Sequence, residues 1–250
     1  DTLRQSSGRM LRREASDHLR SLGGFLDQLG ELDRWQVAGS YRRGKETVGD
    51  LDVLVTAADR EAAVEAILGH EAIEDVISRG TERTSVRLDG GLQVDFRFFD
   101  DDDFGSALLY LTGSKEHSIE LRKRAQSRDW KLSEYGLTKG DDVLAARDEE
   151  GIYGRLDLAW IPPELREDRG EIEAAEKDEL PELIELDQIR GDLHSHTNAT
   201  DGMASIEDMA AAAVERGLEY LAITDHSQRV KVAGGLDEDA LRDHVRRIRE

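Results

Sequence analysis

The spacing of hydrophobic and polar positions changes several times along the chain, and each change predicts a different element. Apolar side chains at helical spacing predict helices over 9–32, 59–69 and 104–125. Gly23-Gly24 should interrupt the first helix, and the Thr-Gly-Ser at 112–114 should break the last one. Short apolar runs predict strands at 35–38 and 51–56, and two further runs flank Asp89-Gly90-Gly91, which predicts a hairpin. Predicted helices and strands therefore follow one another through this part of the chain.

A second rhythm begins after Pro162-Pro163. Residues 164–187 carry eleven acidic and three basic side chains, so we interpret them as a partly helical, solvated connection. From Ile189 onward a strand, a polar loop, a helix over 205–216 and a strand over 218–224 follow one another. This βα alternation predicts the beginning of a parallel sheet or barrel.

The composition restricts the possible environments and partners. The 250 residues contain no cysteine and no apolar run of about 20 residues, which favours a cytoplasmic protein without a membrane span. The net charge of −21 argues against a nucleic-acid partner, since phosphate binding usually leaves a basic surface. However, Arg outnumbers Lys and acidic residues are scattered, a pattern typical of proteins adapted to molar salt, where charge steers partners weakly. Residues 115–131 remain basic. An ordinary acidic protein is the alternative.

The stretch VAGSYRRGKETVGDLDVLV at 37–55 suggests a site for an anion and metal ions. Asp50 and Asp52 stand two apart in a predicted strand, so their side chains share one face about 6.6 Å apart along the chain. Asp95, in LQVDFRFF, supplies a third carboxylate from a neighbouring strand. Such oxygen ligands suit Mg²⁺, which is usually held by carboxylates together with substrate phosphates.

The residues before the aspartates complete this interpretation. Gly39-Ser40 opens a short predicted helix where backbone N–H groups can approach a phosphate, and Arg43 lies one turn later. The alternative is a capped helix followed by two exposed aspartates in a turn. The combined spacing favours the functional interpretation.

These motifs resemble family X DNA polymerases. VAGSYRRGKETVGDLDVLV is similar to the palm of that family, YLTGSKEHSIELRKRA at 110–125 to the segment that holds the nucleotide sugar, and DEEGIYGRLDLAWIPPELRE to its thumb. The resemblance implies a nucleotidyltransferase palm over 1–103 with the end of the fingers, a small α+β thumb over 104–163, an acidic linker over 164–188, and the first βα units of an α/β PHP barrel over 189–250.

The resemblance also implies roles for single residues. Asp50, Asp52 and Asp95 would bind two Mg²⁺ or Mn²⁺ ions and carry out the catalysis. The residues implied to bind substrate are Gly39, Ser40, Arg43, Gly49, Arg9, Tyr110, Gly113 and Arg122. Two positions depart from the family pattern, since Leu111 replaces a usual aromatic residue and Ser118 a frequent asparagine, so we expect altered nucleotide discrimination.

Two histidine-containing loops predict a second metal site. GDLHSHTNATDG and LAITDHS place His194, His196, Asp201 and His226 at successive strand ends, which share one rim in a parallel barrel. Imidazole and carboxylate ligands suit Zn²⁺ or Mn²⁺. The loops resemble the start of a PHP phosphoesterase domain, whose further ligands would lie beyond this sequence, so we expect an incomplete cluster. The remaining histidines with a predicted surface position are His18, His70, His117 and His244.

The expected function is template-directed addition of dNMP to a primer 3′-OH in gap-filling repair, with an appended 3′-5′ exonuclease or phosphoesterase. Partners would be gapped or primed DNA and dNTP, and the protein a monomer. The sequence starts without methionine and ends in a charged helical pattern, so we expect a fragment, of haloarchaeal type by its composition. Two alternatives stay open: a hydrolase with a non-catalytic DNA-binding palm, and a nucleotidyltransferase for RNA ends or a small acceptor.

Overall fold

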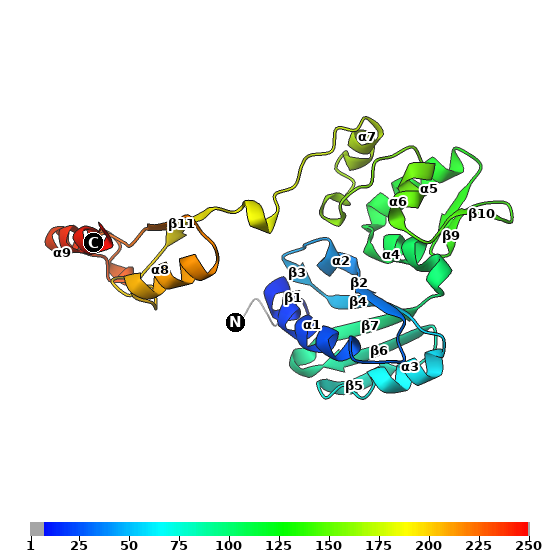
Figure 1. The fold of residues 1–250 in the computed structure, drawn as a ribbon, viewed down its shortest axis with the longest axis horizontal. Coiled ribbons are helices and arrows are strands. Elements are labelled where there is room, and N and C mark those ends of the chain that lie inside the picture. The colour runs from blue at the N-terminus through cyan, green and yellow to red at the C-terminus, as the bar shows by residue number, and fades with distance from the viewer. Residues whose placement is uncertain (1–7, 250) are drawn as a thin grey trace. The chain divides into compact units, whose positions relative to one another are not determined.

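The computed structural model of the protein describes residues 8–249, which divide into two compact units between Leu180 and Pro181. Figure 1 shows the course of the chain through both. The described residues include no helix with the length and apolar character that a membrane crossing requires.

A mixed five-stranded sheet forms the centre of the first unit, in the order β2-β4-β7-β6-β5. Its strands are β2 (Arg34–Val37), β4 (Asp50–Thr56), β5 (Ile73–Ser78), β6 (Arg83–Leu88) and β7 (Gln93–Phe98). β4 and β7 run parallel, and the other neighbouring strands are antiparallel. The predicted hairpin is confirmed, because β6 and β7 are joined by the short turn η1 (Asp89–Gly91), in which both glycines have positive φ.

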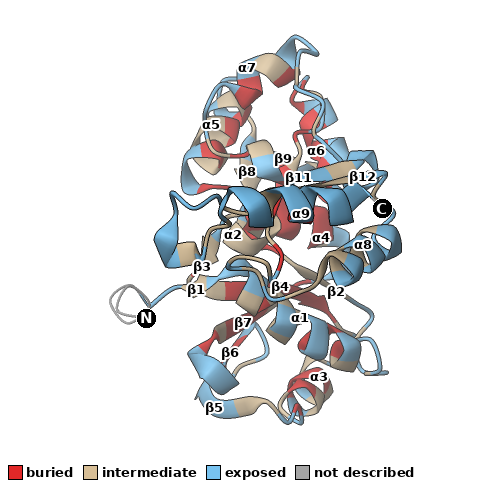
Figure 2. Ribbon diagram, turned by 90° about the vertical axis from the view of Figure 1, so that its left-hand side faces the viewer, coloured by how far each residue is buried: buried red, intermediate tan, exposed pale blue. Residues whose placement is uncertain are grey.

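Apolar side chains cover both faces of this sheet. Helices α1 (Arg12–Leu26) and α3 (Arg60–Ile67) pack with the alternate residues of β4 and β7 into the main core, which includes Leu22, Val53 and Phe96. On the other face, Leu54 packs with helix α4 (Phe104–Thr112). Figure 2 shows buried residues along the central strands, whereas the edge strand β5 is almost entirely exposed. Each large core side chain contributes about 1.5–3 kcal/mol by burial.

The first helix differs from its prediction. α1 continues through Gly23-Gly24 and ends at Leu26, so the predicted interruption is wrong. A Cβ at Gly23 would lie 3.0 Å from a ring carbon of Trp35, which shows that this glycine allows close packing of the helix against β2. Burial of Leu22 and Leu26 on either side offsets the poor helix propensity of glycine.

The remainder of the first unit is a smaller α+β region with its own core. Its elements after α4 are α5 (Lys115–Gln126), β8 (Lys131–Ser133), β9 (Gly136–Lys139), β10 (Asp142–Ala145), α6 (Glu149–Arg155) and α7 (Glu171–Glu176). The helix break at 112–114 is confirmed, because Ser114 caps α5 by accepting a hydrogen bond from the His117 N–H.

The acidic segment after Pro163 differs from a solvated connection. α7 lies within it, and the side chains of Ile172 and Ala175 join the core of the smaller region. The compact unit extends to Leu180. The apolar residues of α7 stand on one face of a charged helix, so charge density alone did not indicate their burial.

Short elements connect the sheet to the predicted anion site. β1 (Met10–Leu11) and β3 (Thr47–Val48) form an antiparallel two-stranded ribbon, and β3 contacts the four-residue helix α2 (Gly39–Arg42). α2 starts at Gly39, which has a φ of +63°.

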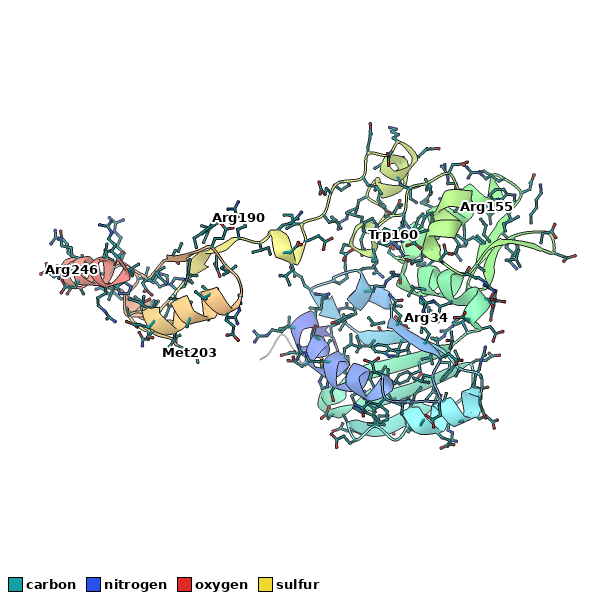
Figure 3. The ribbon with its side chains drawn as sticks, in the orientation of Figure 1. Arg34, Arg155, Trp160, Arg190, Met203 and Arg246 are labelled. Carbon is teal, nitrogen blue, oxygen red and sulfur yellow. The ribbon has the colours of Figure 1, made fainter. Side chains whose placement is uncertain are left out.

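The second unit contains a parallel strand pair and two helices. These elements are β11 (Gly191–Ser195), α8 (Ile206–Glu215), β12 (Tyr220–Ile223) and α9 (Glu238–Arg249). The predicted βα alternation with parallel strands is confirmed, and the residues described here form one strand pair without closing a barrel. Several large apolar side chains are exposed, among them Met203, which Figure 3 labels.

Candidate active site and metal centre

Three carboxylates meet on one face of the central sheet. The parallel register of β4 and β7 sets Asp52 directly opposite Asp95, and Asp50 lies two residues earlier on the same face of β4. Burial and, to a smaller extent, the negative charges of Asp50 and Asp95 together raise the pKa of Asp52 to about 6. A site whose carboxylates repel one another in this way fits a divalent cation, because the ion would remove the repulsion.

Gly39 makes room for this carboxylate group. A Cβ at this position would lie 2.3 Å from Asp52 Oδ2, and the positive φ of Gly39 also disfavours any other residue. The sequence pattern suggested glycine for close approach of a phosphate. The structure adds that only glycine leaves space for the side chain of Asp52.

Two residues that the sequence analysis did not single out contact Asp95. Arg83 Nη2 donates to Asp95 Oδ2 at 2.8 Å, and Gln93 Nε2 donates to Oδ1 at 3.1 Å. Asp95 is only 4% exposed, so both of its oxygens are held in place. Gln93 could have been found from the two-residue period of β7, whereas Arg83 depends on the antiparallel pairing of β6 with β7.

Two of the predicted anion-binding residues, Arg9 and Gly49, lie next to each other. Arg9 donates from Nε to Thr47 Oγ1 at 3.0 Å and from Nη2 to Thr47 O at 2.6 Å. A Cβ at Gly49 would lie 3.3 Å from Arg9 Nη1, so the structure brings these two predicted residues together. Ser40 is the second residue of α2.

A pocket of about 320 Å³ joins the remaining predicted substrate residues. Its lining includes Arg43, Tyr110, Gly113, Ser118 and Arg122. Gly113 stands so close to Ser118 that a Cβ would lie 2.2 Å from the serine oxygen, which explains the need for glycine at the end of α4. Leu111 also lines this pocket, at the position that departs from the family pattern.

A buried ion network ties helix α2 to helix α6 and was not anticipated from the sequence. Glu149 accepts two hydrogen bonds from Arg42, at 2.8 and 2.9 Å, and two from Arg166, at 2.6 and 3.0 Å. Trp160, labelled in Figure 3, donates its indole N–H to Glu149 Oε2 at 3.2 Å. Burial alone would raise the pKa of Glu149, but the two guanidinium groups lower it to about 2.

His117 is fully buried, so its predicted surface position is wrong. Its Nδ1 lies 2.6 Å from Glu171 Oε1, and its Nε2 lies 2.8 Å from the hydroxyl of Tyr153. Burial opposes ionisation of Glu171, yet hydrogen bonds from His117 and from backbone N–H groups lower its pKa to about 2. The three side chains fasten α7 to α5 and α6, and their complementary hydrogen bonding makes the burial of a histidine favourable.

Two other histidines also depart from the surface prediction. His70 is 5% exposed and packs edge-on against Phe25, with ring centres 4.9 Å apart. His244 is buried on α9, where its Nε2 lies close to a carboxylate oxygen of Asp225. His18 is half-buried, with Nδ1 3.3 Å from Asp89 Oδ1.

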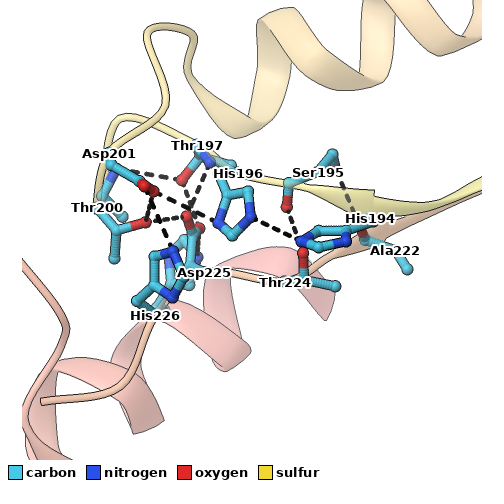
Figure 4. Close-up of polar contacts among 12 residues, drawn as sticks. His194, Ser195, His196, Thr197, Thr200, Asp201, Ala222, Thr224, Asp225 and His226 are labelled. Carbon is cyan, nitrogen blue, oxygen red and sulfur yellow. Dashed lines mark hydrogen bonds and ion pairs between the residues drawn. The ribbon is translucent and has the colours of Figure 1, made fainter. Parts of the chain in front are cut away.

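The second unit brings three of its four predicted ligands together. The ligand atoms of His196, Asp201 and His226 lie within 4.8 Å of one another (Figure 4). His194 stands beside them, with Nε2 3.0 Å from His196 Nε2. His196 Nδ1 is buried and makes no hydrogen bond within the described residues. This unsatisfied nitrogen and the mixed imidazole–carboxylate set fit Zn²⁺ or Mn²⁺.

Asp225 organises the loops around these ligands. Its Oδ1 accepts from the Thr197 N–H and the Thr200 hydroxyl, at 2.8 and 2.6 Å, and its Oδ2 accepts from the Thr197 hydroxyl at 2.6 Å. His244 Nε2 lies 2.6 Å from the same Oδ2, which accounts for the burial of this histidine. Burial would raise the pKa of Asp225, but these hydrogen bonds together lower it. Asp225 thereby fixes the loop that leads to Asp201.

Comparisons with known proteins agree with this division. The family model described as DNA polymerase beta palm matches residues 9–93, the DNA polymerase beta thumb matches 107–167, and the PHP domain matches 192–244. DNA polymerase/3'-5' exonuclease PolX of Bacillus subtilis is 40% identical over 92% of this chain and 40% of its own length. DNA polymerase lambda of Rattus norvegicus is 29% identical over 52% of this chain and 28% of its own length.

The chain covers less than half the length of each of these relatives. The matched regions follow one another in the order of the elements described above, with both polymerase regions in the first unit and the PHP region in the second. The chain therefore consists of the palm and thumb of an X-family DNA polymerase followed by part of a PHP domain.

Proposed function

We propose that this chain adds dNMP to the 3′-OH of a DNA primer and releases pyrophosphate, as part of a polymerase that fills short gaps. The observation that carries this proposal is the register of β4 and β7, which sets Asp52 beside Asp95 with Asp50 on the same face. The names of the relatives, DNA polymerase PolX and DNA polymerase lambda, support the same activity.

In this proposal each group of residues has one task. Asp50, Asp52 and Asp95 would hold two Mg²⁺ or Mn²⁺ ions, which supply charge neutralisation and acidify the primer hydroxyl. Asp95 would also help accept the proton of the primer 3′-OH. The triphosphate would be bound by Gly39, Ser40, Arg43 and Gly49, with Arg9 beside them.

The thumb residues would position the nucleotide and the DNA. Tyr110 and Gly113 would line the sugar pocket, and Arg122 would face the template strand. Arg122 Nε donates a hydrogen bond to the Ser118 carbonyl at 3.1 Å, which holds the arginine side chain beside that pocket. The departures at Leu111 and Ser118 would change nucleotide discrimination, since both side chains line the pocket.

Primer extension on a gapped duplex tests the proposal. With Mg²⁺ and dNTP the wild-type chain should extend the primer, and Asp50→Ala should abolish extension because one metal ligand is lost. Asp75→Ala is the matched control, since Asp75 is an exposed carboxylate on the edge strand of the same sheet. Equal extension by Asp50→Ala and wild type would exclude the polymerase assignment.

The PHP part supports a second activity. We propose that the His196, Asp201 and His226 group, with His194, belongs to a Zn²⁺ or Mn²⁺ site that removes 3′ nucleotides or 3′ phosphates in the whole protein. The printed name of the Bacillus subtilis relative includes a 3'-5' exonuclease. If only this activity were present, the palm would be a DNA-binding platform, and Asp50→Ala would leave every DNA activity unchanged.

The substrate and the environment are also part of the proposal. Comparison of dNTP with rNTP incorporation, on gapped duplex and on single-stranded RNA, separates a DNA polymerase from an enzyme that acts on RNA ends.

We further propose a monomer that works in the cytoplasm at high salt. For such a haloarchaeal-type protein the melting temperature should fall as KCl is lowered, and a melting temperature independent of KCl excludes salt adaptation.

A further inference from the structure

A carboxylate of the chain is paired with Arg43 of the proposed triphosphate site and with the nearby Lys45. Glu167 Oε1 accepts from Arg43 Nε at 2.7 Å, and Glu167 Oε2 lies 3.3 Å from Lys45 Nζ. The side chains of Glu167 and Arg43 are both largely buried. Burial would raise the pKa of Glu167, but the two cations outweigh it and lower the pKa, so this group is ionised at neutral pH.

The contact uses the part of Arg43 that a phosphate would need. A guanidinium binds an oxyanion best through two parallel N–H groups along one edge. Each such edge of Arg43 includes Nε or Nη1, and both nitrogens already donate, Nε to Glu167 and Nη1 to the Thr112 carbonyl at 2.6 Å. The carbonyl is fixed in the backbone at the end of α4, so Glu167 is the partner that can leave.

Glu167 can leave without unfolding the segment that carries it. The preceding residue, Arg166, is fully buried, makes two hydrogen bonds to Glu149 and donates from Nε to the Ile161 carbonyl at 2.9 Å. The backbone N–H of Glu167 is bound to the Leu165 carbonyl at 2.8 Å. With the backbone anchored in this way, rotation of one side chain is enough to free Arg43 and Lys45.

We propose that Glu167 takes the place of a nucleoside triphosphate on Arg43 and Lys45, and that the incoming triphosphate displaces it. Glu167 is then an affinity-determining residue. It pairs with Arg43 and Lys45 before nucleotide binds, and it weakens nucleotide binding because the triphosphate must displace it from both cations. This inference rests on the proposed role of Arg43 in the polymerase reaction. In the opposite role Glu167 would orient Arg43 and strengthen nucleotide binding, and the sign of one measurement separates the two roles.

The measurement is calorimetric titration of the chain with dTTP and Mg²⁺ in the absence of DNA. Glu167→Gln replaces a charged acceptor with a neutral one of the same shape, and should bind dTTP about tenfold more tightly, equal to about 1.4 kcal/mol. Glu167→Asp keeps the charge but shortens the reach, and should give a smaller gain. Asp168→Asn is the matched control, because it removes the same charge from the adjacent exposed residue and should leave affinity unchanged.

Unchanged or weaker binding by Glu167→Gln overturns the inference, as does an equal gain in Asp168→Asn, which would reflect bulk charge. Absence of dTTP binding by every variant overturns it as well. Primer extension by the wild-type chain decides the proposed polymerase function separately. Melting curves of all four proteins establish that they are folded, and Glu167→Asp tests competition even if the neutral variant is unstable.

Discussion

Glu149 offers the sharpest prediction about stability, because its surroundings leave little room for compensation. Its two oxygens accept five hydrogen bonds, from Arg42, Arg166 and Trp160, at 2.6–3.2 Å. Glu149 is 4% exposed and Arg166 is not exposed at all. Loss of the carboxylate would leave the Arg166 guanidinium buried without its counter-charge.

The lowered pKa of Glu149 and the typical cost of breaking a buried ion pair give similar values for the folding free energy that its carboxylate contributes. Lowering the pKa of Glu149 from its ordinary 4.5 to about 2 corresponds to about 3 kcal/mol of folding free energy. Removal of one partner from a buried ion pair typically costs about 3–5 kcal/mol. Because the pKa is lower in the folded state, the contribution is complete above about pH 4.5 and disappears as the pH falls toward 2.

The assay is urea unfolding of Glu149→Gln followed by circular dichroism. We expect the free energy of unfolding to fall by about 3 kcal/mol at pH 7, and the difference from wild type to shrink between pH 4.5 and 3. Glu150→Gln is the control, an exposed carboxylate in the same helix. A loss below about 1 kcal/mol at pH 7, or a difference that does not change with pH, would refute this account of the network.

Three further predictions concern the other buried polar groups. Asp52→Asn should stabilise the metal-free protein by about 2–3 kcal/mol at pH 8, because the pKa of Asp52 is raised to about 6 in the folded state. The gain in melting temperature should vanish as the pH falls from 6 to 4. A gain that persists at pH 4 contradicts this prediction. Tyr153→Phe should lower the free energy of unfolding in urea by about 1–2 kcal/mol through loss of its hydrogen bond to a buried histidine, whereas the exposed Tyr135→Phe should have no effect. Asp225→Asn should weaken Zn²⁺ binding about 10- to 100-fold in calorimetry, because Asp225 holds the loop that carries the ligands. Asp239→Asn, at an exposed position, is the control. Unchanged affinity of Asp225→Asn would show that Asp225 does not position the ligands.

The sequence correctly predicted those elements of the fold that depend on interactions between neighbouring residues. The two-residue period of a strand and a glycine-rich turn are properties of neighbouring residues, so the positions of β4, the β6–β7 hairpin and the break before Ser114 followed from the sequence. The same period put Asp50 and Asp52 on one face. That Asp95 stands opposite Asp52 depended on the resemblance as well, because strand order is not a local property.

The features that sequence patterns missed depend on distant partners. Glu149 and Arg42 are 107 residues apart, and each alone has the character of an ordinary surface charge. The pairing of His117 with Glu171 spans 54 residues, and only this pairing makes burial of the histidine favourable. The acidic composition of the α7 segment likewise suggested a solvated linker, because a short amphipathic helix contributes few apolar residues to the average.

Gly23 illustrates the opposite error. A glycine pair within a helical pattern commonly ends the helix, because glycine has a poor helix propensity. Tertiary packing reversed it, because the missing side chain at Gly23 admits the Trp35 ring. Without knowing which residue packs against it, a glycine that ends a helix cannot be distinguished in the sequence from one that allows close packing.

We propose that Asp50, Asp52 and Asp95 together bind the metal ions of a nucleotidyl transfer reaction. The most direct measurement is anomalous diffraction from crystals of the chain grown with Mn²⁺ and a non-hydrolysable dNTP. We expect two manganese peaks within coordination distance of the carboxylates of Asp50, Asp52 and Asp95, on the face of the sheet that these side chains share. No manganese at these carboxylates, in crystals that do contain the nucleotide, would contradict it.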